Sequence, residues 1–247
     1  MPICHAFIEL KSVDSTNNYA MAKVHAGMAP EGTIFFAYEQ WAGKGQRGKS
    51  WSSLPGENII ISAVLEPVFL SVTRQFPLSA CVALACHDLY SRYVPSGQSS
   101  IKWPNDLYWN DRKAGGILIE NSFRGDKWLA TVAGIGININ QEQFPETLPN
   151  PVSLRQITGH SYDAVEMARQ LGDCLWLRYE QLRELGADFQ LSEYNSRLYK
   201  LGQRIALKWN GTVLETTVKG VGVGGELLTE DTTERQFRFG EVEWIIP

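Results

Sequence analysis

Residues 102–106 read Lys-Trp-Pro-Asn-Asp, and residues 112–116 follow as Arg-Lys-Ala-Gly-Gly. The apolar residues around them predict short strands joined by turns, because proline cannot donate to a strand ladder and the Asn-Asp pair is typical of turns. Lys102 and Lys113 then stand at strand ends, and the glycines after Lys113 permit a ligand to approach the backbone closely. Exposed strand-end lysines and simple turn residues are the alternative interpretation.

A second stretch, residues 43–51, reads Gly-Lys-Gly-Gln-Arg-Gly-Lys-Ser-Trp and follows a predicted strand at 33–38. Its glycines fit G-x-G-x-x-G, but the dinucleotide-binding motif of that form opens a helix, and residues 49–56 cannot begin one. A solvated basic loop is one interpretation. The other is a nest of backbone N–H groups with cations around it, which binds an anion. Such a loop is expected to be mobile when empty and ordered when an anion neutralises it.

Further strands are expected at 3–10, 58–65, 101–103, 107–109, 113–120 and 129–140, and helices at 19–24, 77–93, 163–185 (with Gly186 as its stop) and 191–199. In the 129–140 segment, alternation places Gly134, Gly136 and Asn138 on one face. Glycine weakens a strand interior, so either a ligand or an aromatic side chain of the protein is expected to pack there. Ser15 and Thr16 precede the first helix, where capping is the simplest role.

From residue 204 onward the chain changes to short strands and turns, with Asn210-Gly211 as a strong hairpin signal. The sequence therefore predicts an α+β protein. A mixed β-sheet packed with helices is expected over residues 1–200, followed by a small C-terminal β-barrel-like domain over residues 201–247.

The composition argues against several classes of protein. The chain has 247 residues, of which 44% are hydrophobic and 20% charged, and its net charge of −4 argues against a general nucleic-acid binder. The four cysteines show no C-x-x-C spacing and the four histidines are scattered, so neither a zinc site nor a disulfide framework is expected. No signal peptide is evident, and no apolar run approaches the about 18 to 20 residues of a membrane span. We expect a cytoplasmic protein that binds neither nucleic acid nor membranes.

Taken together, five segments resemble biotin protein ligase, the biotin–[acetyl-CoA-carboxylase] ligase family. They occur in the family's order and comprise Ser-Thr-Asn at 15–17, the stretches 43–51, 102–106 and 113–116, and Gly-Ile-Gly-Ile-Asn at 134–138. The Lys-Trp-Pro-Asn-Asp string is the most specific of them. Residues 221–228 and 240–242 are similar to the family's small C-terminal domain. Because the chain begins directly in the catalytic domain, it resembles the monofunctional type without an N-terminal DNA-binding domain.

This resemblance implies two half-reactions. The carboxylate of biotin attacks the α-phosphate of ATP to give biotinyl-5′-AMP and pyrophosphate, and a lysine of a biotin carboxyl carrier domain then attacks the mixed anhydride and releases AMP. ATP and Mg²⁺ are the implied cofactors, and the metal would be held through phosphates near Asn105 and Asp106. Relatives pair through sheet edges, so a homodimer is among the implied assemblies.

The resemblance also implies roles for single residues. Lys113, Lys102 and Arg47 would be catalytic. The implied biotin-binding residues are Ser15, Thr16, Asn17, Gln40, Gly43, Lys44, Lys113, Gly115, Gly116, Gly134 and Gly136. The implied ATP-binding residues are Lys44, Gln46, Arg47, Trp51, Lys102, Asn105, Asp106 and Asn138, with Trp51 stacking on adenine and Asn138 bonding near it.

One departure concerns the glycine loop, which in the family usually reads Gly-Arg-Gly-Arg-x-Gly. Here Lys44 replaces the first arginine, Gln46 stands at the second, and Arg47 comes one place later. The second arginine is linked to phosphate contact and to retention of the adenylate. Because Gln46 carries no charge, we hypothesise that Arg47 takes over that role.

Three other functions remain open at this point. A lipoate–protein ligase is the nearest enzyme, although the loop ending in Trp51 and the Trp-Pro pair at 103–104 favour biotin. A non-catalytic biotin-binding module is the second alternative, but mere binding would not require both lysines with Asn105 and Asp106. A dinucleotide-binding oxidoreductase is the weakest, because only the glycine spacing supports it.

Overall fold

The computed structural model describes residues 6–246 of the chain. The larger part consists of β1 (Ala6–Leu10), α1 (Thr16–His25), β2 (Thr33–Ala37), β3 (Ile59–Leu65), α2 (Phe76–Tyr90), β4 (Ser99–Lys102), β5 (Asp106–Trp109), β6 (Arg112–Arg124), β7 (Lys127–Ile137), α3 (Leu154–Thr158) and α4 (Ala164–Ser196). The smaller part consists of β8 (Arg204–Trp209), β9 (Thr212–Val221), β10 (Leu227–Glu230), β11 (Glu234–Phe237) and β12 (Val242–Ile245). The predicted strand at 3–10 is confirmed from residue 6 onward, and residues 3–5 lie outside the described residues.

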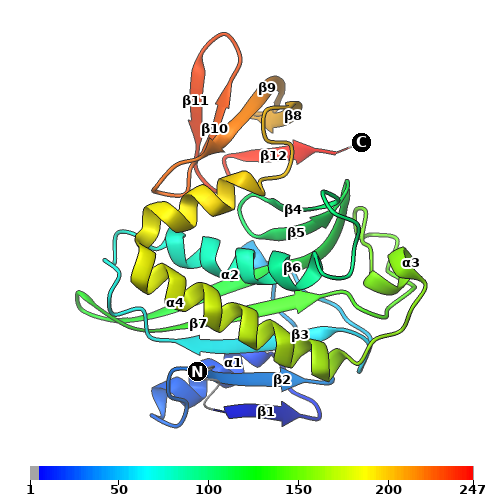
Figure 1. Ribbon diagram of the computed structural model, residues 1–247, viewed down its shortest axis with the longest axis vertical. Helices are drawn as coiled ribbons and strands as arrows, with labels where there is room; N and C mark the ends of the chain where they lie inside the picture. Colours follow the sequence, from blue (N-terminus) through cyan, green and yellow to red (C-terminus); the bar gives the residue numbers. More distant parts are fainter. Residues whose placement is uncertain (1–5, 247) are drawn as a thin grey trace.

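Seven strands form one mixed sheet in the order β1-β2-β3-β7-β6-β5-β4 (Figure 1). β1 and β2 are parallel, and α1 lies in the connection between them, as a parallel pair requires a crossover. The other neighbours pair antiparallel. The predicted α+β class with a mixed sheet is therefore confirmed. β7 ends at Ile137, so Asn138 lies just beyond the strand in which the sequence placed it.

The helices divide between the two faces of this sheet. Phe35, Val64 and Val132 pack with Ala20 of α1 on one face. Side chains at alternate positions of the same strands join the main core with α2 and α4, because successive residues of a strand point to opposite faces. Figure 1 shows α2 and α4 lying side by side across the second face. The short α1 covers only part of its own face, next to β2, β3 and β7.

α4 confirms the predicted break at Gly186. The sequence predicted two helices, and the structure has one long element whose backbone leaves helical geometry at Gly186, with φ 84 and ψ 175. Asp163 caps the first half, since its side chain accepts hydrogen bonds from the backbone N–H groups of Val165 and Glu166 at 2.9 and 3.0 Å. An ion pair of 2.6 Å between Arg178 and Asp88 joins α4 to α2.

Cysteines and charged groups give no sign of a metal cluster in the described part of the chain. Cys81, Cys86 and Cys174 are free and buried, and burial raises the pKa of each thiol. Residues 6–246 hold no group of three or more His, Cys, Asp or Glu side chains arranged for a metal ion. Cys4 and His5 lie outside the described residues.

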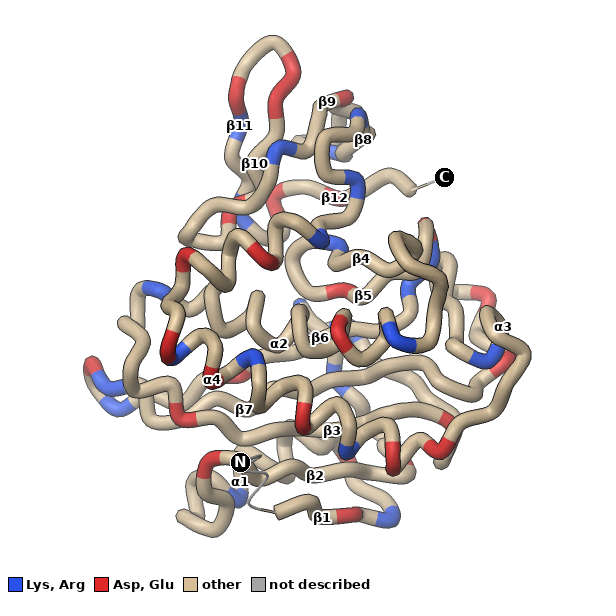
Figure 2. The backbone as a smooth tube through the Cα atoms, in the orientation of Figure 1, with Lys and Arg blue, Asp and Glu red and all other residues tan. Residues whose placement is uncertain are grey.

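In Figure 2, basic and acidic residues are interspersed along the backbone. None of the helices in residues 6–246 has the length and apolar character needed to cross a membrane.

The C-terminal strands form a separate antiparallel sheet in the order β11-β10-β9-β8-β12. The prediction of a separate β region is confirmed, but the predicted barrel does not close: among the described residues, β11 and β12 do not pair. The sheet is nevertheless curled, because Trp209 of β8 and Phe237 of β11 touch with ring centroids 5.6 Å apart across two intervening strands. The four residues 238–241 connect the two outer strands. The domain boundary at residue 200 stays a prediction.

Candidate active site

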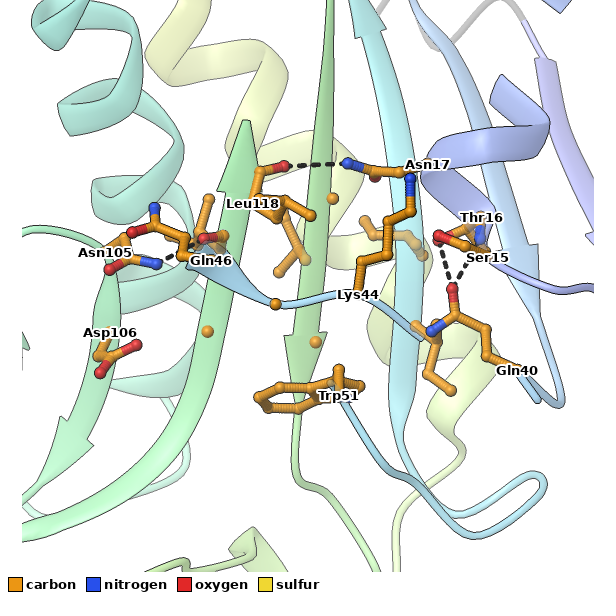
Figure 3. A pocket seen from close by; sticks show the side chains of 18 of the residues that line it. Ser15, Thr16, Asn17, Gln40, Lys44, Gln46, Trp51, Asn105, Asp106 and Leu118 are labelled. Atoms are coloured by element: carbon orange, nitrogen blue, oxygen red, sulfur yellow. Dashed lines mark hydrogen bonds between the residues drawn. The ribbon is translucent and has the colours of Figure 1, made fainter. Parts of the chain in front are cut away.

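A pocket opens on the α1 face of the large sheet, where three glycines leave the strands without side chains. Gly116 of β6 lies opposite Gly136 of β7, and Leu118 lies opposite Gly134. The residues 43–51 cross above this floor, and the N-terminus of α1 borders it (Figure 3). The pocket leaves a free volume of about 60 Å³, which is room for a few water molecules.

At one end of the pocket, Gln40 is held by the first turn of α1. Its Oε1 accepts hydrogen bonds from the backbone N–H of Thr16 at 2.6 Å and from the Thr16 hydroxyl at 3.0 Å (Figure 3). Ser15 occupies the N-cap position but its side chain makes no capping hydrogen bond, so the predicted capping role of Ser15 is wrong. Ser15 and Thr16 instead border the pocket, and both are buried.

Asn17 forms the wall above Gly134 and is held in place by three hydrogen bonds. Its Oδ1 accepts from the Ser62 hydroxyl at 2.6 Å, and its Nδ2 donates to Glu120 at 2.8 Å. The same Nδ2 donates to the Leu118 carbonyl at 3.3 Å, the bond drawn in Figure 3. A Cβ at Gly134 would overlap the Asn17 amide. Glycine is therefore needed at this position so that the wall can approach the strand.

The opposite end carries the lysine and the carboxylate of the predicted phosphate site. Lys113 Nζ lies 2.6 Å from Asp106 Oδ1, and the two side chains are 33% and 17% exposed. Asn105 Nδ2 donates to the Ile117 carbonyl at 2.6 Å, which fixes the turn beside β6. Lys44 reaches across the pocket, donates to Asn18 and lies 4.0 Å from Glu120.

Trp51 covers the glycine floor. A Cβ at Gly136 would overlap its indole, and a Cβ at Gly116 would lie 3.2 Å from its ring. The aromatic side chain expected on this face is thus one of the protein's own, and Lys113 Nζ lies 6.0 Å from its ring centroid. Trp51 Nε1 and Gln46 Oε1 are buried and have no hydrogen-bond partner among the described residues. Both atoms can therefore bond to a ligand or to water.

Comparison with known proteins assigns the chain to a family. The sequence model of the Biotin/lipoate A/B protein ligase family matches residues 9–138. The chain belongs to this family. The biotin–[acetyl-CoA-carboxylase] ligase of Paracoccus denitrificans is 30% identical and is aligned over 92% of this chain and 95% of its own length. This confirms the resemblance to biotin protein ligase.

Other family members differ in length or are known as structures. The bifunctional ligase/repressor BirA of Bacillus subtilis is 36% identical over 61% of this chain. The match spans about half of that relative, 47% of its length. The structure of the biotin protein ligase from Aquifex aeolicus in complex with biotin and ATP superposes with a TM-score of 0.77 at 25% identity, and covers 98% of this chain and 99% of its own.

Against this family background, the structure gathers most of the predicted site residues. Those that line the pocket are Ser15, Thr16, Asn17, Gln40, Lys44, Gln46, Trp51, Asn105, Asp106, Lys113, Gly116, Gly134 and Gly136. Five others stand outside the lining: Gly43, Arg47, Lys102, Gly115 and Asn138. The roles predicted for all of these residues stay predictions.

Three of the five residues outside the lining are engaged by other parts of the protein. Gly43 accepts a hydrogen bond of 2.9 Å from the Trp51 backbone N–H. A Cβ at Gly115 would come within 2.8 Å of the Gly136 carbonyl. Asn138 is buried and donates from Nδ2 to the Val152 carbonyl at 3.2 Å, so its amide is engaged away from the pocket.

Lys102 and Arg47 both contact the C-terminal part of the chain. Lys102 Nζ lies 5.4 Å from the ring centroids of both Tyr108 and Trp244. Burial lowers the pKa of Lys102 to about 8, and the nearby Asp106 carboxylate opposes part of that shift. The Arg47 side chain bonds to the turn before β12 and not to any pocket residue among those described.

Sequence reasoning missed six lining residues: Gly45, Ile60, Ile61, Ile117, Leu118 and Ile135. Strand alternation puts Ile60 on the face of Ser62, and Leu118 lies opposite Gly134, so both can be located once the strand register is known. Ile61, Ile117 and Ile135 belong to the main core, and no periodic signal in the sequence marks them as part of a site.

Proposed function

We propose that this family member activates biotin with ATP to give biotinyl-5′-AMP and transfers biotin to a lysine of a biotin carboxyl carrier domain. The observation that carries the proposal is one pocket with two chemically different ends. Thr16 and Gln40 offer polar groups at one end, Lys113 and Asp106 offer a cation and a carboxylate at the other, and bare glycine strands lie between them. Relatives named for this activity support it.

The two ends fit the two parts of the mixed anhydride. The groups of Ser15, Thr16 and Gln40 suit the ureido ring of biotin, and the glycine floor with Ile60 suits its apolar ring and chain. The carboxylate then points toward Lys113. Two anions must meet in the first step, so the Lys113 ammonium neutralises charge on the biotin carboxylate and on the α-phosphate. A carboxylate oxygen bonds to the α-phosphorus as the bond from that phosphorus to pyrophosphate breaks. In the second step an acceptor amine attacks the acyl carbon, and AMP takes the electrons of the broken bond.

Both ligands require the glycine loop to move. Trp51 occupies the space over Gly116 and Gly136, and its indole N–H lacks an acceptor there among the described residues. We propose that the loop shifts when biotin enters and that Trp51 then stacks on adenine, with Gln46 and Lys44 closing the phosphate side.

The residues near the phosphate end fit a magnesium ion that arrives on ATP. Mg²⁺ usually keeps several waters and is bound by one or two carboxylates together with substrate phosphates. Asp106 offers one carboxylate and Asn105 an amide beside it, while residues 6–246 provide no group of three or more acidic, His or Cys ligands. Asp106 and Asn105 would hold the ion, which would offset phosphate charge.

The low pKa of Lys102 makes adenylation sensitive to alkali. If the Lys102 ammonium assists at the phosphates, its charge is present below about pH 8 and is lost above it. We expect kcat/KM for ATP to fall by up to about tenfold per pH unit above that value. Lys102→Arg keeps its charge and should extend the plateau toward pH 10. The measurement is the pH profile of biotin-dependent ATP–pyrophosphate exchange for both proteins. Superimposable profiles would show that the charge of Lys102 does not assist at the phosphates.

The direct test of the function uses a biotin carboxyl carrier domain as acceptor. Incubation with biotin and MgATP should add one biotin to the carrier, seen as a single mass shift mapped to one lysine. Omission of ATP serves as the first control, and a carrier with that lysine replaced by arginine as the second. Saturable biotin binding without pyrophosphate release and without a mass shift would instead assign a binding module.

A further inference from the structure

The tip of the glycine loop is fastened to the C-terminal sheet. Arg47 Nη1 donates to the carbonyl of Gly240 at 3.1 Å, and the Arg47 guanidinium lies 5.8 Å from the ring centroid of Phe239. Phe239 and Gly240 form the turn between β11 and β12, 193 residues further along the chain. This contact joins a segment that covers the pocket to a sheet that contributes no residue to the pocket lining.

The backbone is adapted to the contact on both sides. A Cβ at Gly240 would overlap the Arg47 guanidinium, and Gly240 has φ 87, which favours glycine. Arg47 itself has φ 56, an uncommon conformation for a residue with a side chain. The guanidinium thus reaches a carbonyl that only a glycine turn leaves accessible.

Phe239 connects this contact with the other half of the site. Its ring packs edge-on against Trp103, with centroids 6.2 Å apart. Trp103 is buried and donates from Nε1 to the Gly225 carbonyl at 2.8 Å. Arg47 and Trp103 of the 102–106 stretch therefore contact the same phenylalanine ring.

Hydrogen bonds across the loop couple its tip to the loop residues that line the pocket. The Gly45 N–H donates to the Lys49 carbonyl at 2.6 Å, and the Trp51 N–H donates to the Gly43 carbonyl at 2.9 Å. These two cross-loop bonds make residues 43–51 a small hairpin. Restraining Arg47 at its tip therefore restrains Gln46 and Trp51, which line the pocket.

We propose that Phe239 and Gly240 are positioning residues that hold the glycine loop over the pocket through Arg47, so that the C-terminal sheet sets how long the adenylate is retained. The retention part rests on the proposed function, whereas the fastening itself does not. If Arg47 instead contacted the phosphates directly, Phe239 would be irrelevant to retention of the adenylate.

The test is hydrogen–deuterium exchange of residues 43–51 in the ligand-free full-length chain. Phe239→Ala should speed exchange of this segment by about two- to fivefold, the scale of one exposed cation–π contact. Arg47→Ala should speed it by about tenfold or more, because it also removes a charge-assisted hydrogen bond. The double variant should not exceed Arg47→Ala by much, because Arg47→Ala already removes both the hydrogen bond to Gly240 and the contact with the Phe239 ring. Phe239→Tyr keeps the ring and should behave as the wild type. Unchanged exchange in Phe239→Ala overturns the proposal.

Phe123→Ala and Arg124→Ala are matched controls. They remove the same two side-chain types from exposed positions at the far end of β6, and they should leave exchange of residues 43–51 unchanged. Equal acceleration in the controls would show general loosening and would contradict the fastening.

The second readout is the rate at which preformed biotinyl-AMP leaves the protein, followed by filter retention. Phe239→Ala should raise it by about two- to fivefold and Arg47→Ala by about tenfold or more. A rise in Arg47→Ala alone would assign Arg47 to the phosphate and overturn the proposal. If biotinyl-AMP never forms, the proposed function fails while the exchange experiment still decides the fastening.

Discussion

Replacing Lys113 by alanine should lower biotin-dependent ATP–pyrophosphate exchange by about a hundredfold to a thousandfold, the usual cost of removing one group aimed at developing charge. Lys113 is the cation that lines the pocket within 2.6 Å of the Asp106 carboxylate, so its loss leaves that negative charge facing the phosphates. The defect should lie in kcat/KM for both substrates, because charge neutralisation acts on the first step as a whole.

The stability of Lys113→Ala should change little. Lys113 is one-third exposed, and an ion pair of this kind contributes about 0 to 1 kcal/mol to the free energy of unfolding. Thermal unfolding of the variant, with Lys127→Ala as a surface control, separates loss of chemistry from loss of fold. Asp106→Asn keeps the cation but removes both its partner and the carboxylate that would hold Mg²⁺, so it should also lower exchange activity. Normal exchange in Lys113→Ala would falsify the assignment.

The second large effect is expected at Gly134. Alanine there would bring a Cβ against the Asn17 amide, which bonds to Ser62 and Glu120. Overpacking in a buried site costs about 1 to 3 kcal/mol. We therefore expect a lower melting temperature together with strongly weakened biotin binding, since the displaced Asn17 wall enters the pocket.

A double-mutant cycle with Asn17→Ala checks the cause. Removing the Asn17 amide relieves the overlap, so the pair Asn17→Ala/Gly134→Ala should be more stable than the sum of the single changes predicts. Strict additivity in thermal unfolding would place the strain elsewhere. Isothermal titration with biotin gives the binding side of the same cycle.

The sequence was most informative where local chemistry decides structure. Alternation in the strand that became β7 showed that Gly134 and Gly136 share a face and that something packs there. It left open whether a ligand or a side chain of the protein does so, and the structure places Asn17 and Trp51 on these glycines. The break at Gly186 was equally predictable, because its φ of 84 suits glycine.

Contacts between distant segments could not be predicted in the same way. Neither composition nor periodicity relates Arg47 to Gly240, and the loop's departure from the family pattern suggested a phosphate contact rather than this fastening. The capping role of Ser15 failed because a residue at the N-cap position does not have to turn its hydroxyl toward the helix, and Ser15 makes no capping hydrogen bond. Closure of the C-terminal sheet depends on pairing of β11 with β12, which their short strand patterns do not specify.

Biotin-dependent exchange of pyrophosphate into ATP is the most direct measurement of what this pocket does. The full-length chain is given MgATP, labelled pyrophosphate and either biotin or lipoate, with no carrier domain present. We predict rapid label incorporation with biotin, little with lipoate, and none with either in Lys113→Ala. Incorporation driven by lipoate, or absent with both acids, would contradict a pocket built to join a biotin carboxylate to adenylate.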